Sequence, residues 1–224
     1  MKHYNIALDG PSGSGKSTVA KALSQKLNIL YLDTGAMYRA AALKAIKLGV
    51  QHKNEEEVSK FINDIDLKID YVDGAQRTIL DGEDVSSAIR ANEVSMMASD
   101  ISALKCVRLK MVDLQRQIAA SMPCVLDGRD IGSFVLPDCK FKFYITADSS
   151  VRAKRRQAEL EQRGQFVNFD TLKKEIEQRD YNDSHRDFAP LKQADDAIYI
   201  DTSDMTVQEV VDKILKVVGE GNVL

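Results

Sequence analysis

The chain has 224 residues and a net charge of -3, with 31 Lys and Arg against 34 Asp and Glu. This length fits one sizeable core with a small insert but not two full domains. The lack of a basic excess excludes a general nucleic-acid binder. The 3 cysteines lie far apart without C-x-x-C spacing, so they indicate neither a disulfide framework nor a zinc site.

The sequence also bears on where in the cell the protein is found. No stretch approaches the ~18 consecutive apolar residues of a membrane span, so we expect no membrane partner. Asp9 interrupts the apolar run near the N-terminus, so we expect no signal peptide and a cytoplasmic protein.

Predicted strands and helices alternate along most of the chain. Short apolar runs predict strands at 4–9, 29–32, 123–127, 140–145 and 197–200. Helical spacing of apolar residues follows the first strand, begins again at Thr34, and returns near the end in Val207, Val210, Val211, Ile214 and Val218. This order is typical of an α/β fold with a parallel sheet covered on both faces.

Two regions differ from this alternation. Residues 67–71 and 77–80 alternate apolar and polar side chains around Asp73-Gly74, which predicts an antiparallel hairpin. A basic, helix-like stretch at 151–164 carries Arg152, Lys154, Arg155, Arg156 and Arg163. We therefore predict a small insert over about 60–105 within the alternating core.

The first predicted strand leads into a glycine-rich loop that matches G-x-x-x-x-G-K-[ST]. Its residues are Gly10, Pro11, Ser12, Gly13, Ser14, Gly15, Lys16, Ser17 and Thr18. Between a strand and a helix, such a loop points backbone N–H groups at a phosphate. Lys16 then reaches the β- and γ-phosphates, and the Ser17 hydroxyl is a ligand for Mg²⁺. The loop predicts binding of a nucleoside triphosphate.

The distribution of arginines narrows the class of protein. A GTPase would need an N-K-x-D motif, which the chain lacks. Arginines occur in four separated places, namely Arg39, Arg129, the 152–156 run, and Arg179 with Arg186. A site that joins two phosphate-bearing substrates needs such guanidinium groups to hold phosphate oxygens. Asp127 ends an apolar strand, where it would act near Mg²⁺ or simply cap the strand.

The scarcity of histidines fits a phosphate acceptor. His3, His52 and His185 all lie outside the loop and outside 127–132. A hydroxyl acceptor would need a general base, whereas a phosphate monoester is already anionic because its second pKa is ~6.

Four segments in order resemble those of bacterial cytidylate kinases, which phosphorylate CMP and dCMP. They are residues 10–18, Asp-Thr-Gly-Ala-Met-Tyr-Arg at 33–39, Asp-Gly-Arg-Asp-Ile-Gly at 127–132, and Arg-Asp-x-x-Asp-x-x-Arg at 179–186. The resemblance runs from the first strand to the last helix. It implies a P-loop nucleoside monophosphate kinase fold with a five-stranded parallel sheet. The core would be 1–59, 106–150 and 166–224, with a monophosphate-binding insert at about 60–105 and a helical lid at about 151–165.

The resemblance also implies roles for individual residues. Contacts around the acceptor nucleotide, mainly its phosphate, fall to Thr34, Arg39, Arg129 and Arg186. Cytosine would be read by Ser99, Arg108 and Asp130, while Arg179 and Asp183 would lie near the sugar and the transferring phosphate. Arg152 and Arg156 of the lid would cover ATP. Ser133 stands where the family more often has Thr, with little expected consequence.

The chemistry of the base agrees with this assignment. A carboxylate such as Asp130 accepts from the N4 amino group of cytosine and opposes the O4 of uracil, while Arg108 donates to N3 or O2. We therefore predict a monomeric enzyme that transfers phosphate in line from ATP to CMP or dCMP with Mg²⁺. The alternatives are another P-loop kinase, for UMP, AMP or a sugar acid, and a nucleotide-switch binding protein.

Overall fold

The computed structural model describes residues 4–50, 54–162 and 164–222. His3, His52 and Arg163, which entered the sequence analysis, lie outside the described residues. The chain divides into two compact units, the first made of 1–29 with 124–224 and the second of 30–123. Each is described by itself below.

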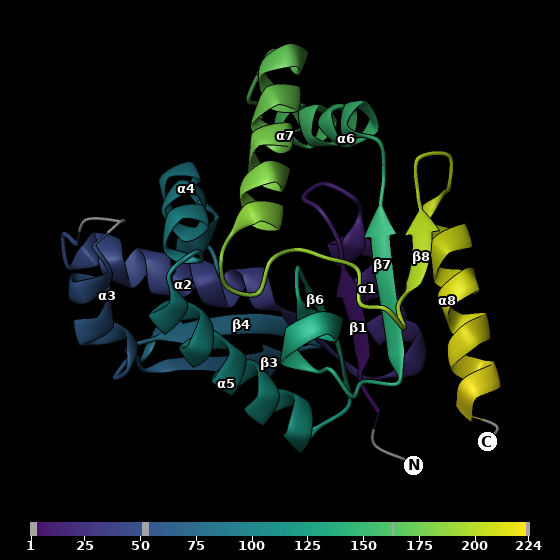
Figure 1. Cartoon of the computed structure of the whole chain (residues 1–224), viewed down its shortest axis with the longest axis horizontal. Helices are drawn as coiled ribbons and strands as arrows, with labels where there is room; N and C mark the ends of the chain where they lie inside the picture. The colour runs from purple at the N-terminus through teal and green to yellow at the C-terminus, as the bar shows by residue number, and fades with distance from the viewer. Residues whose placement is uncertain (1–3, 51–53, 163, 223–224) are drawn as a thin grey trace. The chain divides into compact units, whose positions relative to one another are not determined.

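A five-stranded sheet has the strand order β2-β6-β1-β7-β8. Its strands are β1 (Ile6–Asp9), β2 (Leu30–Asp33), β6 (Cys124–Gly128), β7 (Phe141–Thr146) and β8 (Ile198–Asp201). In the first unit, β1 pairs in parallel with both β6 and β7, and β7 pairs in parallel with β8 (Figure 1). All four residues of β1 are buried, as expected for the central strand of a sheet covered on both faces.

The first unit also contains four α-helices and one short helical segment among the described residues. They are α1 (Lys16–Leu27), η2 (Ile131–Val135), α6 (Ser149–Glu161), α7 (Phe169–His185) and α8 (Val207–Asn222). Helices α6 and α7 pack against each other, and α1 contacts both β6 and α8. A capping box begins α8, because Thr206 and Glu209 exchange hydrogen bonds. The predicted apolar face of α8 is buried except at Val207, which is 44% exposed in the first turn.

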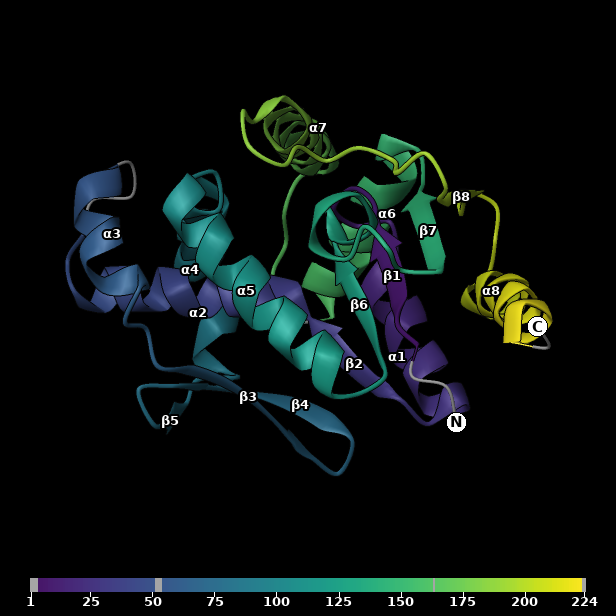
Figure 2. The same cartoon turned by 60° about the horizontal axis from the view of Figure 1, so that its bottom comes forward.

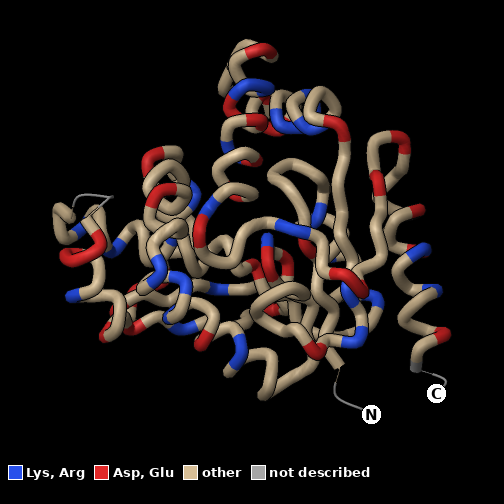
Figure 3. Tube along the Cα trace, viewed as in Figure 1, with Lys and Arg blue, Asp and Glu red and all other residues tan. Residues whose placement is uncertain are grey.

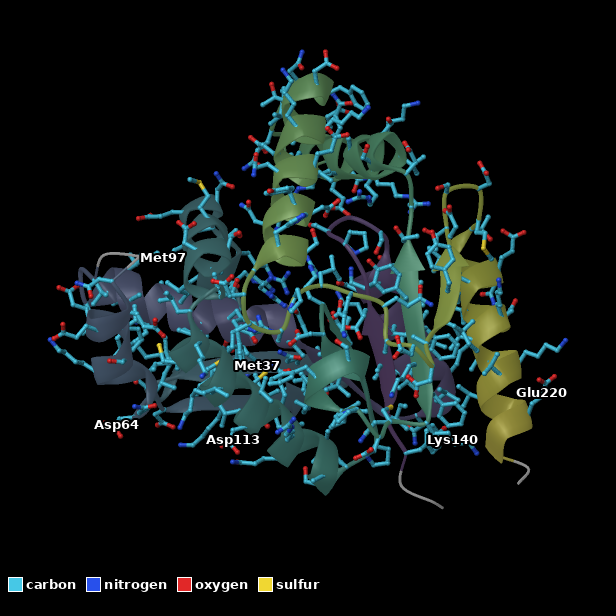
Figure 4. The ribbon with its side chains drawn as sticks, viewed as in Figure 1. Met37, Asp64, Met97, Asp113, Lys140 and Glu220 are labelled. Carbon is cyan, nitrogen blue, oxygen red and sulfur yellow. The ribbon has the colours of Figure 1, made fainter. Side chains whose placement is uncertain are left out.

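The second unit is built around α2 (Thr34–Lys47), which contacts α4, α5 and β4 (Figure 2). Met37, labelled in Figure 4, is one of its buried residues. The remaining elements are α3 (Glu55–Ile62), β3 (Leu67–Val72), β4 (Ala75–Leu80), β5 (Glu83–Asp84), η1 (Ala88–Arg90), α4 (Asn92–Ile101) and α5 (Lys105–Ser121).

The predicted hairpin is confirmed as β3 and β4. These antiparallel strands pair from Leu67↔Leu80 to Val72↔Ala75, and Asp73 and Gly74 form the two-residue turn with φ of 52° and 76°. Two positive φ values match the twist that a tight hairpin turn requires. The sequence analysis missed β5, which pairs with β4 over only two residues. Such a short strand leaves no alternating pattern to detect.

The predicted fold class is confirmed by the parallel sheet, its helices and the separate antiparallel sheet. The proposed limits of insert and lid stay a prediction. In the part of the chain that the structure describes, no helix combines the length and apolar character that crossing a membrane requires.

Candidate active site

The phosphate loop begins where β1 ends and closes where α1 starts. Gly10 has a φ of +145°, and a Cβ built there would lie 1.9 Å from the Ile145 carbonyl oxygen of β7. Only glycine therefore allows the chain to leave the sheet so close to the neighbouring strand. Gly15, with a φ of 89°, precedes the first helical residue, Lys16. The N–H groups of this helix end stand where the sequence predicted a phosphate.

Lys16 is buried within the phosphate loop. Its Nζ donates to the Pro11 carbonyl oxygen at 2.6 Å and to Ser14 Oγ at 3.2 Å. Burial, together with the positive charge of Arg129, lowers the pKa of Lys16 from 10.5 to about 7, although Asp127 and Asp9 partly offset this fall. A buried ammonium group that hydrogen-bonds to neutral oxygens would gain strongly from an incoming phosphate.

Ser17 and Asp127 bring a hydroxyl and a carboxylate together. Ser17 Oγ donates to Asp127 Oδ2 at 2.6 Å. The pair follows from the topology, since Asp127 of β6 lies opposite Leu8 of β1, and the phosphate loop continues from β1. Two side-chain oxygen atoms thus lie side by side at the start of α1.

Asp9, the last residue of β1, fixes the segment that follows β6. Its two carboxylate oxygens accept from the backbone N–H groups of Ile131 and Gly132, each at 2.7 Å. Burial raises the pKa of Asp9 to about 6, and these two hydrogen bonds limit the rise. Asp9 therefore orders the backbone directly after Arg129 and Asp130. The sequence analysis missed this role, although a charged residue at the end of an apolar strand was the available signal.

Arginine and acidic side chains form a cluster between the end of β6 and the end of α7. Arg129 Nε donates to Asp183 Oδ2 at 2.8 Å. Arg186 lies 3.6 Å from Asp130 and 4.0 Å from Asp183, and its Nε donates to the Ala189 carbonyl oxygen at 2.6 Å. This group, with Arg179 one turn before Asp183 on α7, is called the arginine cluster below.

The charges of the arginine cluster act on its central carboxylate. Burial alone would raise the pKa of Asp183, but the positive charges of Arg129, Arg179 and Arg186 hold it below 3.8. Asp183 therefore stays ionised at physiological pH and holds the surrounding guanidinium groups in place.

Charged residues of both signs occur along α6 and α7 (Figure 3). Arg156, predicted to cover ATP, is partly exposed and pairs with Glu159 at 3.2 Å. Arg152, predicted to act with it, is buried instead and bonds to protein atoms, among them the carbonyl oxygen of Ser12 in the phosphate loop. The two arginines of one helix thus have different surroundings.

The second unit holds the other predicted acceptor residues. Asp33 caps α2 by accepting from the Ala36 N–H and also accepts from Arg39 at 2.9 Å. Thr34 is buried at the start of the same helix. In the described part of the chain, Arg39 Nε is buried without a hydrogen-bond partner. A guanidinium group held at one edge only is suited to an anionic ligand.

Arg108 and Ser99 lie in the helices that precede β6. Arg108 of α5 is 1% exposed, donates to the Ser102 carbonyl oxygen at 3.2 Å, and stands 5.5 Å from the centre of the Tyr38 ring. Ser99 of α4 is partly exposed, and its carbonyl oxygen accepts from the Ser102 hydroxyl at 2.9 Å. Arg108 is therefore a buried side chain and not part of the solvated surface.

The sequence model of the cytidylate kinase family matches residues 6–220. The chain belongs to the cytidylate kinase family. Cytidylate kinase from Caldicellulosiruptor saccharolyticus is 46% identical over 98% of this chain and 99% of its own length. Cytidylate kinase from Clostridium botulinum is 44% identical over 97% of this chain and 99% of its own. The predicted resemblance is thereby confirmed.

A solved structure shares the fold at lower similarity. A protein from Eubacterium ventriosum whose function is uncharacterised superimposes with a TM-score of 0.54 at 17% identity, covering 96% of this chain and 98% of that one. The match concerns the fold alone. The assignment to the cytidylate kinase family therefore depends on the sequence comparisons.

For this cytidylate kinase family member, the structure joins some predicted site residues and surrounds others with protein contacts. Ser17 meets Asp127, and Arg129, Asp130, Asp183 and Arg186 form one cluster. The roles of the individual residues toward ligands stay predictions. Sequence reasoning missed Asp33 and Asp180 as partners of the predicted residues Arg39 and Arg152. Each stands beside a predicted residue or inside a quoted segment, which was the only signal.

Proposed function

We propose that this protein catalyses ATP + CMP → ADP + CDP and accepts dCMP in the same way. The observation that carries the proposal is the phosphate loop with its buried Lys16, together with the arginine cluster in the same unit of a cytidylate kinase family member. The phosphate loop would bind the triphosphate of the donor. The arginine cluster would bind the phosphate of the acceptor.

Charge neutralisation and alignment are the main tasks of such a site. Lys16 would stabilise the charge that develops between the β- and γ-phosphates. Arg129 and Arg186 would hold the acceptor phosphate, with Arg179 and Asp183 beside the sugar and the transferring group. Because the acceptor oxygen is already anionic, no side chain has to remove a proton from it.

The residues present fit a Mg²⁺ ion held with the help of the nucleotide. Ser17 Oγ and Asp127 Oδ2, 2.6 Å apart, are oxygen ligands of the kind that Mg²⁺ prefers, and phosphates and water would complete its shell. When bound, the ion offsets negative charge on the phosphates. Ser17 would then exchange its hydrogen bond to Asp127 for a bond to the ion.

Recognition of the base is proposed for three residues. Asp130 would accept from the amino group of cytosine, and Arg108 would donate to its N3 or O2. The burial of Arg108 supports this role, since a buried polar edge discriminates strongly against a base that leaves it unpaired. In the second unit, Ser99 would be the third residue that contacts cytosine, and Thr34 and Arg39 would contact the acceptor nucleotide mainly at its phosphate.

We further propose that the enzyme acts as a monomer in the cytoplasm. Cys106, Cys124 and Cys139 are all free thiols, and burial raises the pKa of each. Unpaired thiols support a reducing compartment.

The direct test measures ADP release with ATP and each of CMP, dCMP, UMP, AMP and a sugar acid such as gluconate. CMP and dCMP should give the highest kcat/KM. A higher value for UMP, AMP or the sugar acid would assign another acceptor. Slow ATP hydrolysis that is indifferent to all of them would favour a nucleotide-switch protein.

A further inference from the structure

Arg152 is bound to three separate parts of the first unit. Its side chain is 7% exposed, and its Nε donates to the carbonyl oxygen of Ala147, which follows β7, at 2.9 Å. One terminal nitrogen donates to the Ser12 carbonyl oxygen in the phosphate loop at 3.0 Å. The other lies 2.6 Å from Asp180 Oδ2 on α7. All three nitrogens of the guanidinium group are therefore engaged by protein atoms.

The stem of Arg152 also packs against the loop backbone. A Cβ built on Gly13 would lie 3.3 Å from the Cβ of Arg152 and 3.5 Å from its carbonyl oxygen. Gly13 has a φ of +75°, which side chains rarely adopt. The loop thus lies directly on the first turns of α6, and its shape at Ser12 and Gly13 depends on what α6 presents there.

Holding the Ser12 carbonyl has a consequence for phosphate binding. In a planar trans peptide the C=O and the following N–H point in opposite directions. When Arg152 draws the Ser12 oxygen toward α6, the Gly13 N–H is turned to the other side of the loop. A phosphate loop binds through N–H groups that converge on the anion, so this peptide must not rotate.

Asp180 completes the arrangement from α7. Its Oδ2 is the oxygen that pairs with Arg152, while Oδ1 is buried without a hydrogen-bond partner in the described part of the chain. A second, indirect link runs through Thr202: Arg155 donates to it, and its hydroxyl lies 3.2 Å from the Ser14 carbonyl oxygen and 3.0 Å from that of Thr146. Arg152 thus contacts a loop carbonyl directly, and Arg155 is connected to the loop only through Thr202.

We propose that Arg152 and Asp180 act as a pair of positioning residues that fix the Ser12–Gly13 peptide of the phosphate loop for binding of the triphosphate. The proposal deepens the proposed function and rests on it for the identity of the nucleotide. It replaces the role predicted from sequence for Arg152, a direct contact with ATP. Arg156, which is partly exposed on the same helix, keeps that predicted role.

The two roles for Arg152, positioning of the phosphate loop and direct contact with ATP, predict different effects of its removal. Loss of a positioning residue weakens binding of the phosphate chain, whereas loss of a contact with adenosine does not. Inorganic tripolyphosphate contains the phosphate chain without adenosine, so it serves as a probe of the loop alone. The variants are Arg152→Met, Asp180→Asn and the double variant. Lys154→Met is the matched control, because it removes one positive charge from an exposed position of the same helix. Calorimetric titration gives the Kd for tripolyphosphate and for ATP, and the ADP assay gives KM for ATP and for CMP.

We expect Arg152→Met and Asp180→Asn each to weaken tripolyphosphate and ATP by similar factors, about tenfold, as for loss of a charge-assisted hydrogen bond. The double variant should be no worse than Arg152→Met, because both changes break the same connection. KM for CMP should stay near the wild-type value. Lys154→Met should bind both probes as the wild type does.

Several results would overturn the proposal. Weaker ATP with unchanged tripolyphosphate would return Arg152 to a contact with adenosine. Normal binding by Asp180→Asn, or a double variant that multiplies the two losses, would break the pair. If Arg152→Met does not fold by circular dichroism, Arg152→Lys takes its place, since it keeps the charge near Asp180 and loses the planar fork. Wild-type protein that binds tripolyphosphate without phosphorylating CMP would contradict the proposed function and leave the pair to be judged by binding alone.

Discussion

The phosphate loop and the arginine cluster differ in the groups that their positive side chains contact. In the loop, Lys16 donates to a carbonyl and a hydroxyl oxygen, and burial lowers its pKa to about 7. In the arginine cluster, Arg129 and Arg186 face the carboxylates of Asp183 and Asp130. Lys16 thus hydrogen-bonds to neutral oxygens and feels the carboxylates of Asp127 and Asp9 only through their charge, whereas Arg129 and Arg186 form ion pairs with acids.

This difference has a consequence for binding. A phosphate that reaches Lys16 would replace hydrogen bonds to neutral oxygens, so it would bind without displacing a paired carboxylate. A phosphate that reaches Arg129 or Arg186 must share them with carboxylates of the same sign. The cluster would therefore gain less affinity but more selectivity, since only a ligand with the right geometry can share both arginines.

The strongest test of the comparison is Lys16→Met. Losing a cation that stabilises transferring charge costs about 3 kcal/mol or more, or roughly two orders of magnitude in kcat. Folding should not suffer, because the change removes a charge that burial penalises. Steady-state ADP release measures the loss of kcat, and a thermal melt measures the effect on folding. Turnover near the wild-type rate in a folded variant would contradict the role of the loop, and a large drop in melting temperature would contradict the lowered pKa.

The second test addresses the arginine cluster through Arg186→Ala and Arg186→Lys. Loss of the guanidinium group should reduce kcat/KM for CMP and dCMP equally, by about 2 kcal/mol for a charged hydrogen-bonded contact. Lys should recover little, because it lacks the planar fork. Kinetics with both acceptors measure the effect. The control is the Kd for tripolyphosphate, which should stay unchanged; full activity in Arg186→Ala would remove this residue from the acceptor site.

The third test separates charge compensation from base reading at Asp130. Asn is nearly isosteric but offers both a donor and an acceptor, so Asp130→Asn should narrow the preference for CMP over UMP by about 1–2 kcal/mol. The measurement is the ratio of kcat/KM for the two acceptors in wild type and variant. An equal loss for both acceptors would instead assign Asp130 to holding Arg186, 3.6 Å away.

The smallest expected effect is on the proton uptake and pH dependence of tripolyphosphate binding. The free enzyme holds a proton on Lys16 only below a pKa of about 7, whereas a bound polyphosphate favours the charged form. Binding of tripolyphosphate at pH 8 should therefore take up nearly one proton, and affinity should fall about fivefold between pH 7 and pH 8. Calorimetry in buffers of different ionisation enthalpy measures the uptake. Lys16→Met is the control, and equal uptake in that variant would assign the proton to another group.

The same pKa predicts a direction for stability. The unfolded chain keeps the Lys16 proton up to pH 10.5, and the folded chain releases it above about 7. Between these values the unfolded state binds more protons, so this residue makes the free energy of unfolding rise with pH. Asp9 acts in the opposite sense at lower pH, because its raised pKa of about 6 favours the protonated folded state and that contribution is lost as pH rises through 6.

The fold and the identity of the loop were accessible from sequence because both depend on local patterns. The strand, glycine loop and helix at 4–27 and the Asp73-Gly74 turn each carry their signal within a few residues. Long-range partners were not accessible in this way. Asp9 meets Ile131 across 122 residues and Arg152 meets Ser12 across 140, and no spacing in the sequence records either contact. Burial likewise separated Arg152 from Arg156, although both are arginines of one helix.

The position of β1 at the centre of the sheet also bears on how the protein is made. Ile6 pairs with Val125 on one side and with Phe141 on the other. Contacts between such distant residues slow folding, since the intervening chain must be gathered first. A ribosome releases the glycine-rich loop early but must synthesise more than half of the chain before either neighbour of β1 exists. Nascent chains that end before β7 should therefore fail to retain a nucleotide, and the N-terminal segment should wait unfolded until late in translation.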